Sequence, residues 1–188
     1  MGERYQPAGR LPGIAAYEAA PDPRTRMPIF RQPRNPTGRA YGRAELEAVA
    51  AFAIRHDLVV VSDEIHADIV YPGNPHIPLA SLHPEIAART ITITSKTQSF
   101  NIPALRRAVM HFGVPALQER FFSRIPARLL GSPGVTGVDA TVAAWDDGQP
   151  WLDEILAQPR ANRDWLARTI AAELPGVTMR VPEATYLA

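Results

Sequence analysis

The sequence contains no cysteine among its 188 residues. This absence excludes disulfide bonds, thiolate catalysis and metal sites with cysteine ligands, and it is typical of proteins of the cytosol. Net charge is also nearly absent, because 20 lysine and arginine residues balance 19 acidic ones. We therefore expect neither a nucleic acid nor a membrane surface as partner. The first residues lack the apolar core of a signal peptide, and no apolar run is long enough to span a bilayer, so we predict a cytoplasmic protein.

Lysine is almost missing as well. Lys96 is the only lysine, and the other nineteen basic side chains are arginines. Arginine keeps its proton near neutral pH, whereas a desolvated lysine can form an imine with a carbonyl compound. If this chain performs covalent amine chemistry through a side chain, Lys96 must perform it, and Lys96 is therefore the candidate catalytic residue.

The order of the predicted elements indicates an α/β fold. A short strand at 27–30 precedes a helix at 43–56, in which apolar residues recur at helical spacing. A continuous apolar run at 58–62 is typical of a strand buried on both faces. Strand, helix and strand in this order predict a βαβ unit with parallel strands. Further strands are expected at 90–94 and 108–112, which gives a mostly parallel sheet with flanking helices.

The rest of the chain is predicted to be mostly helical. Shorter segments are a strand at 69–71 and helices at 80–88, 115–124 and 135–145. A long helix is expected from 151 to about 173, and Pro159 should kink or split it. The segment 177–181 resembles another strand.

Polar residues follow the predicted strands at the points where ligands bind in open α/β sheets. Asp63 ends the buried strand, where an ionised carboxylate needs a cation nearby. Asn35 lies in a turn after the preceding strand, and Ser95 and Arg106 flank the loop that holds Lys96. A hydroxyl and a guanidinium suit a phosphate group. A ligand with a phosphate, a carbonyl and a protonatable nitrogen would match all five residues. Taken singly, each has a plainer explanation as a cap, a strand end or a surface ion pair.

Metal binding is not expected. Asp63, His66 and Asp68 lie close together in the sequence, but no second group of residues with ligand spacing completes a site.

Three runs of residues, taken in order, resemble a fold-type-I pyridoxal-phosphate enzyme. They are Asn35-Pro36-Thr37-Gly38, the run SDEIHAD at 62–68, and the stretch 95–106. More narrowly, DEIHADIVY followed by HIPLASLHPEIAARTITITS is similar to the cystathionine β-lyase-like, or C–S lyase, branch of the class I/II aminotransferases. The similarity extends over residues 27–188.

This resemblance implies an incomplete three-layer sandwich, the large domain of fold type I, followed by the start of the C-terminal small domain. Three regions are expected: an irregular arm at 1–26, a partial cofactor-binding domain at 27–150, and a kinked helix with the start of the small domain at 151–188. Relatives are about twice as long, so the chain is expected to be truncated at both ends.

The resemblance also implies roles for the candidate residues toward pyridoxal 5'-phosphate. Asn35 would hydrogen-bond the phenolic oxygen of the cofactor, and His66 occupies a position that faces the same oxygen. Asp63 would pair with the pyridinium nitrogen and keep the ring an electron sink. Ser95 and Arg106 would bind the phosphate.

The lysine of the family is not in its expected place. The resemblance implies a lysine three residues after Ser95 and eight before Arg106, and this position is Gln98. A glutamine amide cannot form an imine. Lys96 lies two residues earlier. In an extended chain the two side chains face the same way, roughly 6.6 Å apart along the strand. If the chain has already turned, Lys96 points elsewhere.

Two functions therefore stay open. The first is a pyridoxal-phosphate C–S β-lyase or aminotransferase that acts on a small amino acid, with catalysis impaired. The second is a non-catalytic truncated relative, or an interaction module, that binds the cofactor weakly or not at all. For either function, the expected protein contact is a homodimer or an association with a full-length relative.

Overall fold

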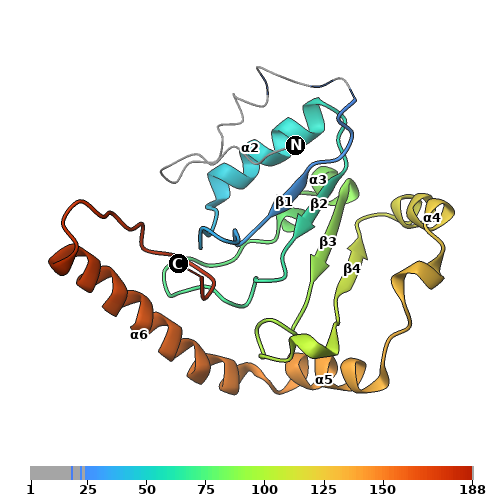
Figure 1. Ribbon diagram of the computed structural model, residues 1–188. Coiled ribbons are helices and arrows are strands. Elements are labelled where there is room, and N and C mark those ends of the chain that lie inside the picture. The colour runs from blue at the N-terminus through green and yellow to red at the C-terminus, as the bar shows by residue number, and fades with distance from the viewer. Residues whose placement is uncertain (1–17, 19–21, 23, 188) are drawn as a thin grey trace.

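The computed structural model describes residues 18, 22 and 24–187, and its centre is a four-stranded sheet (Figure 1). The strands are β1 (Ile29–Arg31), β2 (Val60–Asp63), β3 (Thr90–Thr94) and β4 (Val109–Phe112), and they lie in this order across the sheet. The first three run parallel, and β4 is antiparallel to β3. The predicted α/β fold with a mostly parallel sheet is confirmed.

Helix α2 (Arg43–Arg55) connects β1 to β2 and completes the predicted βαβ unit. Its start is stabilised by Glu45, whose side chain accepts a hydrogen bond from the Gly42 N–H at 3.0 Å. A carboxylate in the first turn is also favoured by the helix dipole. The apolar residues at helical spacing are all buried: Leu46, Val49, Ala50 and Ala53.

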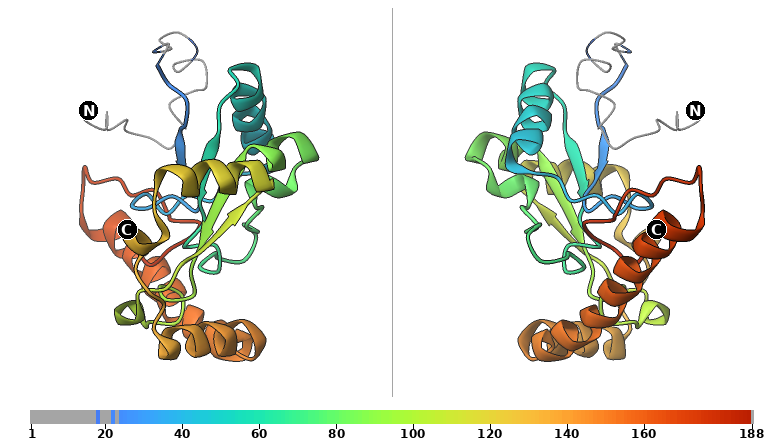
Figure 2. Two further views of the ribbon diagram at one scale, coloured as in Figure 1. Left: turned by 90° about the vertical axis from the view of Figure 1, so that its right-hand side faces the viewer. Right: turned by 90° about the vertical axis from the view of Figure 1, so that its left-hand side faces the viewer.

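The hydrophobic core lies between the sheet and a layer made of α2, the 3₁₀ helix η1 (Leu79–Ser81) and α3 (Pro84–Ala88) (Figure 2). The single helical segment predicted at 80–88 is in fact two short helices. Pro84 has no N–H to continue a helix, so it begins a new one. His83 caps that start, because its Nδ1 accepts a hydrogen bond from the Ile86 N–H at 3.4 Å.

The second half of the described chain is largely helical, as predicted. It contains η2 (Pro103–Leu105), α4 (Pro115–Arg124), η3 (Ala127–Leu130), α5 (Val135–Asp146) and α6 (Gln149–Glu173). Helix α5 and the start of α6 pack against the loops that flank β3 and β4 (Figure 1). Two glycines allow this close approach: a Cβ at Gly148 would overlap the ring of Phe100, and one at Gly137 would lie 3.2 Å from the Leu105 carbonyl.

Two expectations for the C-terminal part are wrong, the split at Pro159 and the strand at 177–181, whereas the alternative of a kink at Pro159 stays a prediction. Pro159 does not split the long helix, because α6 continues through it as one helix of 25 residues. Proline removes one backbone donor, and the turns on both sides continue without it. The segment 177–181 is not a strand, and Val177 and Val181 are 52% and 46% exposed. A strand needs a neighbour to pair with, and none of the described strands lies beside this segment.

The final described residues return to the sheet as a single bridge. Ala184 pairs antiparallel with Val70, which replaces the short strand predicted at 69–71. The division of the chain into three regions stays a prediction. The irregular arm at 1–26 lies largely outside the described residues, and α6 begins at Gln149, just before the expected boundary.

Candidate functional site

Four of the predicted site residues belong to segments that meet at one edge of the sheet (Figure 1). Asp63 is the last residue of β2, and Ser95 directly follows β3. Asn35 lies in the turn that follows β1. Arg106 lies just before β4, which begins at this edge because it is antiparallel to the other strands. Parallel strands end on the same side, so the topology alone gathers these segments.

Asp63 keeps much of its capacity to accept hydrogen bonds. Its Oδ2 lies 3.8 Å from Arg31 Nε, and its Oδ1 accepts from the Ile65 N–H at 3.4 Å. Both contacts are long, and the side chain is 24% exposed. A carboxylate has room for several strong donors, so Asp63 can accept a further cationic group at this edge.

His66 presents an unsatisfied ring nitrogen. The residue is 5% exposed, and its Nδ1 is buried with no hydrogen-bond partner among the described residues. The ring packs edge-on against Tyr186, with 5.8 Å between the centroids. Burial lowers the pKa of His66, although the negative charge of Asp63 opposes this shift. His66 is therefore neutral at pH 7, and Nδ1 is the orphaned polar atom of the site.

Ser95 is buried, and its hydroxyl shapes the turn after β3. It donates a hydrogen bond to the Arg107 carbonyl oxygen and accepts one from the Thr97 N–H at 3.1 Å. The structure thus brings Ser95 next to the backbone of the segment that carries Arg106. To bind a phosphate, the Ser95 hydroxyl would have to donate its hydrogen bond to a phosphate oxygen instead of to the Arg107 carbonyl.

The side chains of Arg106 and Asn35 make no hydrogen bond or ion pair with any residue that the structure describes. Arg106 is exposed, and its backbone is left-handed with φ 47°. Asn35 is half-buried. Both side chains are available to a ligand, but the guanidinium of Arg106 is not in contact with the hydroxyl of Ser95.

Lys96 lies in the turn after β3 and contacts residues of two other segments. Strand β3 ends at Thr94 and the chain turns at once, so the extended alternative is wrong. The Nζ of Lys96 lies 2.7 Å from Asp68 Oδ1. It also lies 5.9 Å from the centroid of the Trp145 ring in α5. Gln98 makes a local contact, with its Oε1 accepting from the Thr97 hydroxyl at 2.9 Å.

Glu64 is a buried ionisable residue that sequence reasoning missed. It is 3% exposed and lies directly after β2. Its carboxylate accepts hydrogen bonds from the Ser62 hydroxyl, the Leu79 N–H and the Gln32 amide, and it binds His76 Nε2 at 2.8 Å. Burial alone would raise the pKa of Glu64, but the hydrogen bonds, first that of His76, bring it below its ordinary value. Glu64 therefore ties the end of β2 to the loop before η1.

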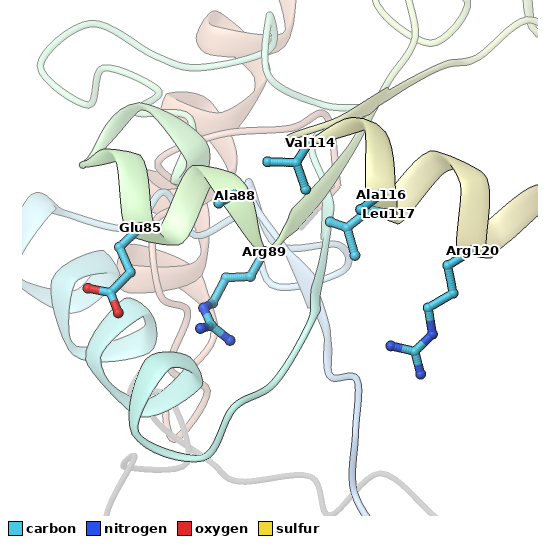
Figure 3. A pocket seen from close by; sticks show the side chains of 7 residues that line it. All are labelled: Glu85, Ala88, Arg89, Val114, Ala116, Leu117 and Arg120. Carbon is cyan, nitrogen blue, oxygen red and sulfur yellow. The ribbon is translucent and has the colours of Figure 1, made fainter.

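Two surface hollows of the described chain lie away from the predicted site residues. One, between α3 and α4, is lined by Glu85, Ala88, Arg89, Val114, Ala116, Leu117 and Arg120 (Figure 3). Another lies between the loop 70–75 and α6. Neither contains a predicted site residue. Among the described residues, no group of histidine and acidic side chains could hold a metal ion, and no helix is long and apolar enough to cross a membrane.

The fold is of the α/β class, and comparison with known proteins gives the family. The sequence matches the aminotransferase class I and II family over residues 12–188, so the chain belongs to this family. It is 32% identical over 166 residues to the cystathionine β-lyase PatB of Bacillus subtilis, with 88% of this chain and 43% of that protein covered. It is 34% identical over 181 residues to the protein MalY of Escherichia coli, with 96% and 44% covered.

Solved structures show the same relationship. The structure of OvoB superposes with a TM-score of 0.86 at 43% identity, over 92% of this chain and 45% of that one. The pyridoxal-phosphate-bound C–S lyase of Staphylococcus hominis superposes with a TM-score of 0.78 at 32% identity, over 86% and 40%. The chain therefore spans less than half the length of these relatives.

Proposed function

We propose that this chain binds pyridoxal 5'-phosphate as part of a C–S β-lyase or aminotransferase-like protein that acts on small amino acids, and that its own catalysis is impaired. The single observation that carries the proposal is the shared sheet edge, where Asp63, Ser95 and the segments of Asn35 and Arg106 meet. The names of the relatives, cystathionine β-lyase and pyridoxal-phosphate-bound C–S lyase, support the same ligand and chemistry.

The side chains at this edge fit the cofactor as a noncovalent ligand. Asp63 has spare acceptor capacity for the protonated ring nitrogen. The buried Nδ1 of His66 lacks a partner, and the phenolic oxygen of the cofactor would supply one. Arg106 has no competing ion pair among the described residues and would hold the phosphate together with Ser95. When bound, pyridoxal phosphate supplies an electron sink for chemistry at the substrate α-carbon.

The residues of the turn after β3 do not fit covalent attachment of the cofactor. The family resemblance implies a lysine at the position of Gln98, and an amide nitrogen is not a nucleophile. Lys96 donates to Asp68 at 2.7 Å and is only 14% exposed. The turn after β3 directs it toward α5. We therefore assign this chain no reaction step that depends on a lysine–cofactor bond.

An equilibrium titration with pyridoxal phosphate, followed by the absorbance of the cofactor, tests the proposal. Wild-type protein should bind it saturably, and Asp63→Asn should bind at least about ten-fold more weakly, because a hydrogen bond between charged groups is lost. Asp57→Asn is the matched control: Asp57 lies before β2, at the other end of that strand, and pairs with Arg89. Equal binding by Asp63→Asn and Asp57→Asn would remove the proposed site.

Impaired catalysis predicts no turnover of cystathionine, cysteine or simple transamination pairs above a cofactor-only control. The physical reason is that the only lysine is held in an ion pair. Lys96→Ala should leave this background unchanged. A robust lyase rate from the purified chain, abolished by Lys96→Ala, would overturn this part of the proposal.

A second candidate function is an interaction module, and the exposed apolar residues of α5 and α6 favour it. Val142, Trp145 and Trp151 are 49%, 46% and 40% exposed. Large apolar side chains gathered on one part of a surface often mark protein contacts. Sedimentation and the cofactor titration together separate the alternatives. The interaction module predicts self-association or a complex with a full-length relative in sedimentation, and no saturable cofactor binding in the titration.

A further inference from the structure

The ammonium of Lys96 and the hydroxyl of Ser99 share one carboxylate. Lys96 Nζ lies 2.7 Å from Asp68 Oδ1, and Ser99 Oγ donates to Asp68 Oδ2 at 2.9 Å. Asp68 comes from the turn after β2, whereas Lys96 and Ser99 come from the turn after β3. Both oxygens of Asp68 are thus used to join two adjacent turns.

The surroundings of this pair restrict access to the lysine nitrogen. The side chains of Lys96 and Asp68 are 14% and 22% exposed, so the pair is screened less by water and salt than a surface pair. Trp145 of α5 lies within cation–π distance of the ammonium. Ser99 is 6% exposed, so it also holds the carboxylate from the buried side.

We propose that Asp68 is a masking residue: it keeps the only side-chain amine of the chain in an ion pair and so withholds it from carbonyl and acyl compounds. An ammonium has no lone pair, and an electrophile reaches the nitrogen only when the pair opens and a proton leaves. Asp68 acts through Lys96 and is a positioning residue. The inference explains the noncovalent binding in the proposed function, but it does not depend on the cofactor.

Acetylation by an N-hydroxysuccinimide ester measures the masking without any cofactor. The amine nitrogen attacks the ester carbonyl, an amide bond forms, N-hydroxysuccinimide leaves, and the nitrogen loses a proton to buffer. Because Lys96 is the only lysine, digestion at arginine yields the peptide 90–106 as its sole reporter. Mass spectrometry of this peptide, with a short lysine peptide added as internal standard, gives the relative rate at Lys96.

Asp68→Asn should raise the acetylation rate of Lys96 about five-fold or more, as the loss of a partly buried ion pair implies. Ser99→Ala keeps the ion pair and should raise the rate less than about two-fold, because only a neutral hydrogen bond is lost. Asp57→Asn makes the same chemical change in the Arg89 pair and should leave the rate unchanged. An unchanged rate in Asp68→Asn would overturn the proposal.

A second comparison decides the matter even if Asp68→Asn fails to fold. Lys96 in the folded wild-type protein should be acetylated at least about ten-fold more slowly than in the urea-unfolded chain, since local opening limits the reaction. Equal rates, each corrected by the internal standard, would show an unmasked amine and would contradict the inference whatever the variants do. A loss of cofactor binding in the titration would leave both acetylation results unaffected.

Discussion

Glu64 and His76 form a buried pair, with 2.8 Å between Glu64 Oε2 and His76 Nε2 and only 4% and 12% of their side chains exposed. The pair joins the residue after β2 to the loop that leads into η1. Burial works against the charge of Glu64, but the hydrogen bonds from His76, Ser62 and Leu79 lower its pKa below the ordinary value. A charge that is stabilised only in the folded state makes stability depend on pH.

The first prediction concerns acid stability. Because the pKa of Glu64 is lower in the folded than in the unfolded chain, Glu64 stabilises the fold above the ordinary glutamate pKa of about 4.3. This contribution is lost as the pH falls through the folded-state value. Glu64→Gln should lower the free energy of unfolding at pH 7 by about 1–3 kcal/mol and should flatten its decrease between pH 5 and 3. Urea denaturation at several pH values, with exposed Glu85→Gln as control, measures both effects. Identical pH profiles for the two variants would contradict the role of Glu64.

A second prediction concerns His66. Burial lowers its pKa in the folded state, so folding favours the neutral ring. The stabilising contribution is present above the unfolded histidine pKa of about 6.5 and is lost as the pH falls from there toward the lower folded value. The free energy of unfolding should therefore decrease from pH 7 to pH 5, and His66→Asn should reduce this slope. Exposed His56→Asn is the control, and NMR titration of the His66 ring gives the pKa directly. A ring that titrates above 6.5 would be inconsistent with the buried neutral state.

A third prediction concerns the turn that carries Asn35. The carbonyl of Gly38 accepts hydrogen bonds from the N–H groups of Glu183 and Ala184 at 2.7 and 2.8 Å, which holds the C-terminal segment on this turn. Gly38 has φ +62°, and a Cβ there would lie 2.5 Å from Pro182 Cβ. Gly38→Ala should cost about 2–5 kcal/mol, the sum of left-handed strain and overpacking.

Gly73→Ala is the matched control for this turn. Gly73 also has positive φ, +92°, but nothing lies within 4 Å of the Cβ that alanine would add. It should therefore cost only about 1–2 kcal/mol of backbone strain. Denaturant unfolding of both variants gives the comparison. Equal losses would mean that the C-terminal segment does not pack on the turn as described.

A fourth prediction concerns the proline inside α6. Pro159 removes a backbone hydrogen bond from an otherwise continuous helix. Pro159→Ala should raise the free energy of unfolding by about 1–3 kcal/mol, and Tm with it. Pro150 lies in the first turn, where its missing N–H costs little, so Pro150→Ala should change stability by less than about 0.5 kcal/mol. A Pro159→Ala variant with unchanged or lower Tm would contradict the destabilisation that we attribute to the missing backbone hydrogen bond.

The sequence predicted the fold where local pattern and packing agree. Leu46 and Val49 recur at helical spacing, and the continuous apolar run at 58–62 is typical of an inner strand, so the βαβ unit follows from the local pattern. The segment 177–181 has β-branched residues as well, but a strand exists only beside a partner, and the sequence of one segment does not show its neighbour. The unbroken course of α6 through Pro159 was likewise not visible in the local pattern.

For the candidate site, strand ends were predictable and side-chain partners were not. Asp63 and Ser95 lie at the same edge because parallel strands end together, which the order of elements already implies. The direction of Lys96 depends on Asp68, 28 positions earlier in the chain, and on a turn that begins as soon as β3 ends. A lone lysine among arginines signals a special role, but only the fold shows that its partner is a carboxylate.

The central claim is that pyridoxal phosphate binds at this edge without a bond to Lys96, and borohydride treatment tests it most directly. The protein is dialysed against the cofactor, reduced with borohydride and digested at arginine, and the mass of the peptide 90–106 is measured. A covalent link to the lysine nitrogen would be fixed by reduction and would add a phosphopyridoxyl group to this peptide. We predict that, at equilibrium, more cofactor is found on the protein side of the dialysis membrane than on the other side. After reduction, we predict that the peptide 90–106 is unmodified. A peptide that carries the phosphopyridoxyl group, or a protein that retains no cofactor, would contradict the account.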